Sequence, residues 1–288
     1  MNKIDENILQ KLFPGREKQA KKYDHGSVLI IGGSEIYSGS PALAGLAAMR
    51  GGADIVQIIA PKRSADIVAG FGPDFITYPV EGPNLSTDHL SRLLEITASA
   101  KIVSRGKLSV VIGGGIGRKE ETKELVRRYV EEVDVPITID ADGIYAFEDQ
   151  GKDLLSENVV FTPHLYEFYI LTGQKIDGLS LEEKVDTVTQ QAAQLGATIA
   201  LKGATDIISD GSETRINPVA VPELTAGGCG DTLAGLVGAM LAKGEDRLDA
   251  VSCGIYMNTA AGKLAVKEKG EALIAVDLIE KIPQLIKR

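Results

Sequence analysis

The sequence contains no tryptophan, only two cysteines and only three histidines. The cysteines, Cys229 and Cys253, lie far apart and predict neither a disulfide framework nor a CxxC metal site. The histidines are too scattered to supply the ligands of a zinc site; they are His25, His89 and His164. The sequence therefore argues against a disulfide-stabilised secreted domain and against a zinc centre.

Positive charge and long apolar runs are also scarce. Lysine and arginine number 31 against 40 acidic residues, which gives a formal net charge of −9. Such a chain is a poor electrostatic match to nucleic acid or to an anionic membrane, although backbone N–H groups can still bind nucleotide phosphates. The charged N-terminal segment has no signal-peptide core, and the apolar runs are too short to span a bilayer. We expect a cytoplasmic protein without nucleic-acid or membrane partners.

Glycine is abundant, at 32 residues, and 44% of the chain is hydrophobic, as is typical of a globular protein. No internal repeat or linker divides the chain, so we expect one domain over residues 1–288. Short apolar runs recur, and they are continuous rather than alternating, as in strands buried on both faces of a sheet. The runs are Ser27–Ile31, Asp54–Ala60, Ser109–Ile112, Pro136–Ile139, Asn158–Phe161 and Thr198–Leu201.

Helical patterns alternate with these runs. They cover Pro41–Arg50, Lys119–Val133, Leu181–Leu195, Asp231–Lys243, Asp249–Lys267 and a last segment from Asp277. Between Asp206 and Pro218 the pattern instead predicts a hairpin that turns at Asp210-Gly211. The alternation predicts an α/β fold with a mainly parallel sheet, helices on both faces and an antiparallel edge.

The residues that follow the strands are more informative than the strands. The strand ends are Gly32-Gly33-Ser34, Gly113-Gly114-Gly115, Asp140-Ala141-Asp142, Thr162-Pro163-His164 and Lys202-Gly203. In open parallel sheets, ligands bind beyond the carboxyl ends of the strands. Ordinary turns explain any one of these segments, but they explain five together less well, so we expect a ligand site at this edge. Asp140 and Asp142 alternate, so one should reach the site while the other braces a loop.

The strongest local signal is a glycine-rich turn followed at once by a helix, over Thr225–Thr232. Backbone N–H groups and the positive end of the helix dipole would converge there on an anion. The predicted anion hole comprises Gly227, Gly228, Cys229 and Gly230. Asp231 lies where the helix starts, and two interpretations stay open: a helix N-cap, or a general base that accepts a proton from a substrate hydroxyl. The helix terminus would keep its carboxylate ionised.

Two common nucleotide-binding motifs are missing. The chain has no GxxxxGK[ST] loop, and Gly113–Arg118 does not fit GxGxxG, which argues against an ordinary Walker-A protein and a plain dehydrogenase. Cys229 as a nucleophile is disfavoured because the motif contains no base to activate it. The small residues Ala234, Gly235, Gly238 and Ala239 are expected to permit close helix packing.

The order of motifs resembles a known family. Along the chain occur HGSVLIIGGS from His25, SGSPALAGLAAMRGGA from Ser38, GGGIG from Gly113, IDADGI from Ile139, FTPHLYEF from Phe161, LKGATDIISDG from Leu201 and TAGGCGDTLAG from Thr225. This order over residues 20–270 resembles the NAD(P)H-hydrate dehydratases of the ribokinase-like superfamily. The TPHxxE and GGxGD blocks are together quite specific. The resemblance implies a ribokinase-like three-layer α/β/α sandwich.

The resemblance also implies residue roles. Asp231 would be the catalytic aspartate, and the substrate would contact Ser40, Ala42, Gly117, His164 and Asp231. The nucleotide would be held by Lys202, Gly203, Ala204, Thr205, Asp206 and Gly230. Glu167 and Asn158 would support these residues without touching the ligands, and no side chain would bind the metal directly. Cys229 stands where the family has Thr, and Gly114 where it has Pro, while IDADGI replaces a DADAL-like block.

The implied activity is the ADP- or ATP-dependent dehydration, with Mg²⁺, of the S epimer of NADH hydrate and NADPH hydrate, a hydro-lyase reaction of metabolite repair. ADP is expected by analogy alone. The alternative is a small-alcohol kinase of the hydroxyethylthiazole-kinase type, and a third possibility is a nucleotide sensor or scaffold without catalysis. The resemblance further implies a homotetramer. An epimerase domain is often fused on the N-terminal side in this family, but only about twenty residues precede the first predicted strand, so we expect this chain to lack that activity or to obtain it from another protein.

Overall fold

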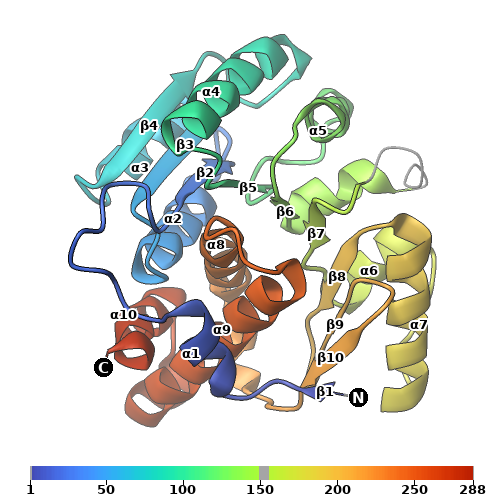
Figure 1. Cartoon of the computed structure of the whole chain (residues 1–288). Coiled ribbons are helices and arrows are strands. Elements are labelled where there is room, and N and C mark those ends of the chain that lie inside the picture. The colour runs from blue at the N-terminus through green and yellow to red at the C-terminus, as the bar shows by residue number, and fades with distance from the viewer. Residues whose placement is uncertain (1, 149–155, 288) are drawn as a thin grey trace.

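The computed structural model describes residues 2–148 and 156–287, and the predicted strands form the middle of one sheet (Figure 1). Within these residues the strands are β1 (Asn2–Lys3), β2 (Ser27–Ile31), β3 (Ile55–Pro61), β4 (Phe75–Val80), β5 (Leu108–Ile112), β6 (Ile137–Ile139), β7 (Val159–Phe161), β8 (Thr198–Leu201), β9 (Asp206–Ser209) and β10 (Thr214–Asn217). Their order is β1-β10-β9-β8-β7-β6-β5-β2-β3-β4. All neighbours are parallel except β9, which is antiparallel to β8 and β10.

Helices cover both faces of this sheet (Figure 1). They are α1 (Asn7–Leu12), α2 (Gly39–Arg50), α3 (Lys62–Ala69), α4 (Leu90–Val103), α5 (Glu120–Glu132), α6 (Leu165–Thr172), α7 (Leu181–Leu195), α8 (Cys229–Leu241), α9 (Arg247–Lys269) and α10 (Ala275–Ile286). Short 3-10 helices are η1 (Thr87–His89), η2 (Ala141–Phe147), η3 (Pro222–Thr225) and η4 (Gly270–Ala272). Side chains of α2, α8, α9 and α10 belong to one core, and those of α4, α5, α6 and α7 to the other. The predicted three-layer sandwich with an antiparallel edge is confirmed.

The continuous apolar runs are explained by this double coverage. In β2, Val28 and Ile30 point into the first core, while Leu29 and Ile31 point into the second. All four side chains are buried, so the strand shows no alternation between apolar and polar residues. The antiparallel edge follows from the predicted hairpin, in which Thr214 pairs with Ser209 across the turn.

Small residues bring α8 close to its neighbours, as the sequence predicted. A Cβ on Gly235 would lie 2.1 Å from the carbonyl oxygen of Ala44 in α2, and one on Gly238 would lie 2.5 Å from Val111 in β5. Any side chain at Gly235 would therefore push α2 and α8 apart. The packing fixes the N-terminus of α8 relative to the sheet.

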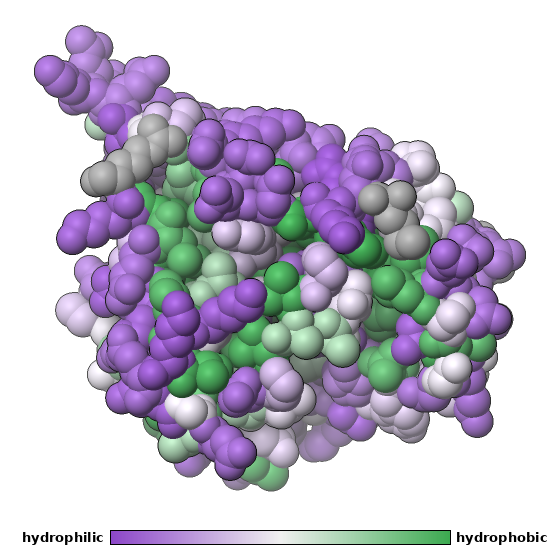
Figure 2. Space-filling view, turned by 90° about the horizontal axis from the view of Figure 1, so that it is seen from below, coloured by the Kyte–Doolittle hydropathy of each residue, from purple (hydrophilic) through white to green (hydrophobic). Residues whose placement is uncertain are grey.

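One face of the molecule mixes hydrophilic and hydrophobic residues (Figure 2). Figure 2 shows one face on which charged and polar residues dominate and hydrophobic residues lie mainly in the recesses between them. Among residues 2–148 and 156–287, no helix combines the length and apolarity needed to cross a membrane.

Candidate active site

The five chemistry-bearing strand ends lie side by side. They belong to β2, β5, β6, β7 and β8, which are consecutive neighbours in the sheet. The chain leaves β2 toward β3 and β4 and later returns to the other side of β2 with β5, so the strand order reverses between β2 and β5. The two glycine runs meet there, where the Gly33 N–H donates to the Gly114 carbonyl at 2.8 Å. A switch point of this kind is where doubly wound sheets bind ligands.

Helix α8 starts at this edge through a glycine. Gly228 is the N-cap residue, with φ of +92°, a conformation that side chains rarely adopt, and the helix begins at Cys229. Asp231 is the third helical residue, and no side chain caps the helix. The N-cap interpretation of Asp231 is therefore wrong, because the glycine has taken that position. Its carboxylate does not cap the helix and is available to other groups at this edge.

The backbone amides of the turn are mostly unpaired. Among the described residues, the N–H groups of Gly227, Gly228 and Gly230 have no hydrogen-bond acceptor within the chain. The Cys229 N–H is an exception, since it donates to the Ala226 carbonyl at 3.2 Å. Of the four amides in the predicted anion hole, the three glycine amides are therefore available at the positive end of α8, and the Cys229 amide is already engaged.

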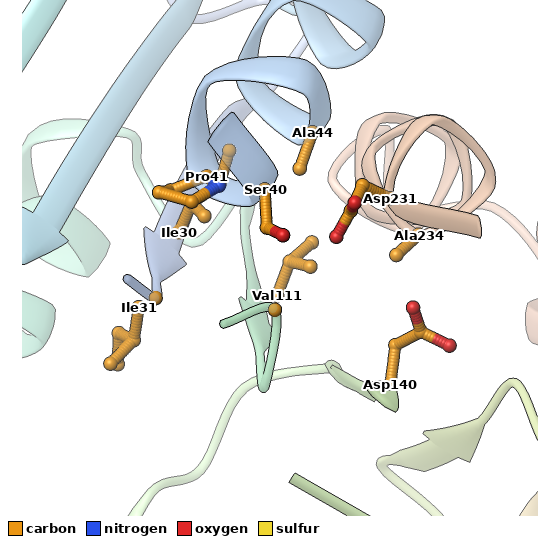
Figure 3. A pocket seen from close by; sticks show the side chains of 11 residues that line it. Ile30, Ile31, Ser40, Pro41, Ala44, Val111, Asp140, Asp231 and Ala234 are labelled. Carbon is orange, nitrogen blue, oxygen red and sulfur yellow. The ribbon is translucent and has the colours of Figure 1, made fainter. Parts of the chain in front are cut away.

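Asp231 points from α8 toward Ser40 at the start of α2 and lies near Asp140 (Figure 3). A Cβ on Gly114 would come within 2.8 Å of its Oδ1 atom, so only glycine leaves room for the carboxylate. Burial and the nearby Asp140 carboxylate raise the pKa of Asp231 to about 7, although a hydrogen bond from Ser40 lowers it. The helix terminus was expected to keep this carboxylate ionised; with a pKa of about 7 it is only partly ionised near neutral pH, because burial disfavours the charged form.

A buried ion pair lies beside Asp231. The Nζ atom of Lys202 lies 2.8 Å from Oδ1 of Asp140 and 3.7 Å from Oε2 of Glu167. Thr162 also donates to Oδ1 of Asp140, at 2.7 Å. The side chain of Asp140 is only 4% exposed and that of Lys202 is 22% exposed. Asp140 is thus the carboxylate that reaches the site, as expected for one of the alternating pair.

Asp142 braces the glycine run instead. Its Oδ2 atom accepts the Gly117 N–H at 3.0 Å, and its Oδ1 atom accepts Nε–H of Arg118 at 2.7 Å. Across the site, Nδ1 of His164 caps helix α6 by accepting the N–H groups of Tyr166 and Glu167. These two local networks fix the outer boundary of the site.

Most of the predicted ligand residues line one cleft of about 690 Å³. They are His164, Lys202, Gly203, Ala204, Asp206, Gly227, Gly228, Cys229, Gly230 and Asp231. Asp231, Asp140 and Ser40 also line a small adjoining cavity of about 10 Å³ (Figure 3), which has room for roughly one water molecule. Asp231 therefore lies where the cleft and the small cavity meet.

Three predicted contacts lie elsewhere. Ala42 is 2% exposed and packs in the core of α2 and α8, so only its backbone could reach a ligand. Gly117 and Thr205 flank the cleft without lining it. Their proposed roles stay predictions.

The cleft also has an apolar wall that was not predicted from the sequence. It is formed by Val219, Ala220, Val221, Pro222, Leu224 and Ile255, together with the polar Asn258 and Thr259. The only available signal was the apolar VAVPEL segment between the hairpin and the glycine-rich turn. An apolar wall in the same cleft as unpaired amides suits a ligand with a flat ring at one end and phosphates at the other.

The part of the chain described by the structure contains no group of three or more His, Cys, Asp or Glu side chains placed to hold a metal ion. A metal that enters with nucleotide phosphates needs no such cage, because Mg²⁺ keeps several water ligands and binds one or two carboxylates at most. An ion that enters with the nucleotide is therefore compatible with these residues.

We expect both thiols to be unreactive in the folded protein. Cys229 and Cys253 are buried, and burial raises their pKa values to about 11 and about 12. Because the thiolate is the reacting form, alkylation at about pH 8 should be slow without denaturant and complete with it. Mass spectrometry of iodoacetamide-treated protein measures this directly. Fast alkylation of Cys229 in the native protein would revive the nucleophile interpretation.

Known proteins resemble this chain over most of its length. A family model described as NAD(P)H-hydrate dehydratase matches residues 28–284. A bifunctional NAD(P)H-hydrate repair enzyme of Pyrobaculum aerophilum is 41% identical over 95% of this chain and 53% of its own length. An ADP-dependent (S)-NAD(P)H-hydrate dehydratase of Nitrosopumilus maritimus is 33% identical over 97% and 95%.

A solved structure extends the comparison. The ADP/ATP-dependent NAD(P)H-hydrate dehydratase of Bacillus subtilis, co-crystallised with ATP and Mg²⁺, superposes with a TM-score of 0.82 at 25% identity. The superposition covers 99% of this chain and 97% of the bacterial one. The chain spans about half the length of the bifunctional relatives and nearly the full length of the stand-alone ones.

Proposed function

The chain belongs to the NAD(P)H-hydrate dehydratase family, and from this premise we propose that it uses ADP to dehydrate the S epimer of NADH hydrate and NADPH hydrate. ADP is preferred over ATP in this proposal because two stand-alone relatives are named for it. Homotetramer formation stays a prediction from the resemblance, and a cytoplasmic location stays a prediction from the sequence.

One observation carries the proposal. Asp231 is the third residue of α8 and follows the unpaired amides of Gly227, Gly228 and Gly230. A hydroxyl beside Asp231 would therefore meet a phosphoryl group held by those amides. Phosphoryl transfer needs a positioned acceptor and stabilisation of the negative charge that develops on the phosphoryl oxygens.

The reaction can be followed through the chain's own residues. The hydroxyl of the hydrated nicotinamide ring gives its proton to Asp231 while its oxygen attacks the terminal phosphorus of ADP, and the bond to the leaving phosphate oxygen of AMP breaks. The glycine amides bind the equatorial phosphoryl oxygens during this step. The bond between the ring carbon and the phosphate oxygen then breaks and inorganic phosphate leaves. The neighbouring ring carbon loses a proton, and the ring double bond is restored. The products are NAD(P)H, phosphate and AMP.

Mg²⁺ would accompany the nucleotide and supply positive charge to its phosphates. The apolar wall formed by Val221, Leu224 and Ile255 faces the same cleft as the glycine amides. It suits the purine ring, since burial of a flat apolar surface contributes affinity without charge. Lys202 and Asp206 then lie on the polar side of the same cleft.

Recovery of the near-ultraviolet absorbance of NADH tests the proposal. Protein, NADH hydrate and Mg²⁺ are mixed with ADP, with ATP or with no nucleotide. Recovery that requires a nucleotide, and is faster with ADP, is the expected result. Accumulation of a stable phosphate ester without NADH would instead identify a small-alcohol kinase. Nucleotide binding with no turnover of any hydroxyl substrate would favour a sensor.

A further inference from the structure

Arg118 comes immediately after the glycine run that follows β5, next to Gly117, which flanks the cleft without lining it. Its Nε–H donates to Asp142 at 2.7 Å, and its guanidinium carbon lies 3.7 Å from the centre of the Tyr145 ring. The negative charge of Glu167, which also lines the cleft, acts on the same guanidinium. The side chain is therefore held between η2 and the glycine run, on the side of the site where His164 and Glu167 lie.

The guanidinium is held in place, but part of its hydrogen-bonding capacity is unsatisfied. Of its nitrogen atoms only Nε has a hydrogen-bond or ion-pair partner among the described residues, and the side chain is 55% exposed. The two terminal nitrogens therefore have no partner among the described residues. A guanidinium that is already ordered by a carboxylate and an aromatic ring loses little entropy when it binds an anion. Such a group is suited to phosphate oxygens, which it can bind with two parallel hydrogen bonds.

The other cation of the site is not free in this way. Lys202 forms its ion pair with Asp140 and lies close to Glu167. A dinucleotide substrate whose ring reaches Asp231 still carries two negative charges on its pyrophosphate. The chain as a whole has a net charge of −9, so those charges need a local cation at the boundary of the site.

We propose that Arg118 binds the pyrophosphate of the hydrated dinucleotide substrate and thereby selects dinucleotides over smaller hydrated nicotinamides. The inference rests on the proposed function. Arg118 is next in sequence to Gly117, and Asp142 accepts hydrogen bonds from both the Gly117 N–H and the Arg118 side chain. The same carboxylate therefore positions the guanidinium and the glycine run. The ring end of the substrate lies toward Asp231 and the phosphate end toward Arg118.

A purely structural role for Arg118 makes a different prediction. If Arg118 only held Asp142, its loss would release Gly117 and slow the reaction of every substrate alike. If Arg118 binds the pyrophosphate, its loss raises KM only for substrates that contain phosphate. The two roles are separated by the hydrate of reduced nicotinamide riboside, which carries the same ring hydroxyl and no phosphate.

The experiment compares Arg118→Gln with the wild type on NADH hydrate and on the riboside hydrate, at saturating ADP. We expect KM for NADH hydrate to rise about 10- to 100-fold with kcat little changed. For the riboside, kcat/KM should stay within about twofold. Arg92→Gln, which removes an exposed arginine of α4 whose ion pair in the described part of the chain is with Glu95, is the matched control and should change the kinetics of neither substrate.

Equal losses on both substrates, or an unchanged KM for NADH hydrate, would overturn the proposal. A rise in KM for ADP instead would assign Arg118 to the nucleotide. The salt dependence gives a second readout: KM of the wild type for NADH hydrate should rise with ionic strength, and that of Arg118→Gln should rise much less. If the wild type restores no NADH at all, the proposed function itself fails, which is a distinct result.

Discussion

Asp231→Asn should lose nearly all turnover and become more stable at the same time. The variant keeps the shape of the side chain but cannot accept a proton, so kcat should fall about 100- to 10,000-fold. The gain in stability follows from the partial burial of the residue, which desolvates the carboxylate and raises its pKa from 3.8 to about 7. A buried carboxylate that must ionise destabilises the folded state, and Asn removes that penalty.

The sign of the pH dependence follows from the same shift. The folded protein binds the Asp231 proton more tightly than the unfolded chain, so the free energy of unfolding falls as pH rises from about 4 to about 7. Asn does not titrate, so its advantage should grow over this range and then stay constant. Because Asp231 is partly exposed, we expect a gain of roughly 2 kcal/mol at about pH 8.

Urea denaturation at several pH values measures the stability, and the NADH recovery assay measures the rate. The wild-type rate should rise with pH through about 7, as the base becomes ionised. Asp66→Asn alters an exposed carboxylate of α3 and should change neither quantity. A less stable Asp231→Asn protein would show that burial of the carboxylate does not destabilise the fold. A variant that keeps its rate would show that Asp231 is not the base.

The fold could be predicted to within a few residues where burial is complete. The runs predicted for β2 and β8 coincide with the strands, and the helix predicted for α7 coincides with Leu181–Leu195. Strand β4, Phe75–Val80, was not predicted because it lies at the edge of the sheet, is half-exposed and contains Pro79. Its sequence therefore lacks the continuous apolar run that the buried strands show.

The location of the site could be predicted from the sequence, but the ion pair inside it could not. Each strand end was identified by its own local composition, and the parallel sheet brings those ends together. The pairing of Lys202 with Asp140 joins residues that are 62 positions apart, and no local pattern encodes it. The same holds for Asp231. Its residue type fits a helix N-cap, but Gly228 takes that position, because the N-cap here has a φ of +92° that side chains rarely adopt.

That unpredicted pair should also have a large effect on stability. In Lys202→Met the Asp140 carboxylate, which is 4% exposed, loses its counter-ion next to Glu167 and Asp231. Breaking a buried ion pair by removing one partner leaves an uncompensated charge, so we expect a loss of about 3 kcal/mol in the free energy of unfolding. Urea denaturation near neutral pH measures it.

The double variant shows whether the charge, rather than the lost side chain, is responsible. Asp140→Asn combined with Lys202→Met removes both charges, so it should recover about half or more of the lost stability. Lys62→Met, which breaks an exposed pair with Asp66, should cost less than about 1 kcal/mol. Equal losses in the single and double variants would mean that packing explains the effect. Recovery in the double variant would mean that Lys202 neutralises a carboxylate cluster, and that nucleotide phosphates must share its charge with Asp140.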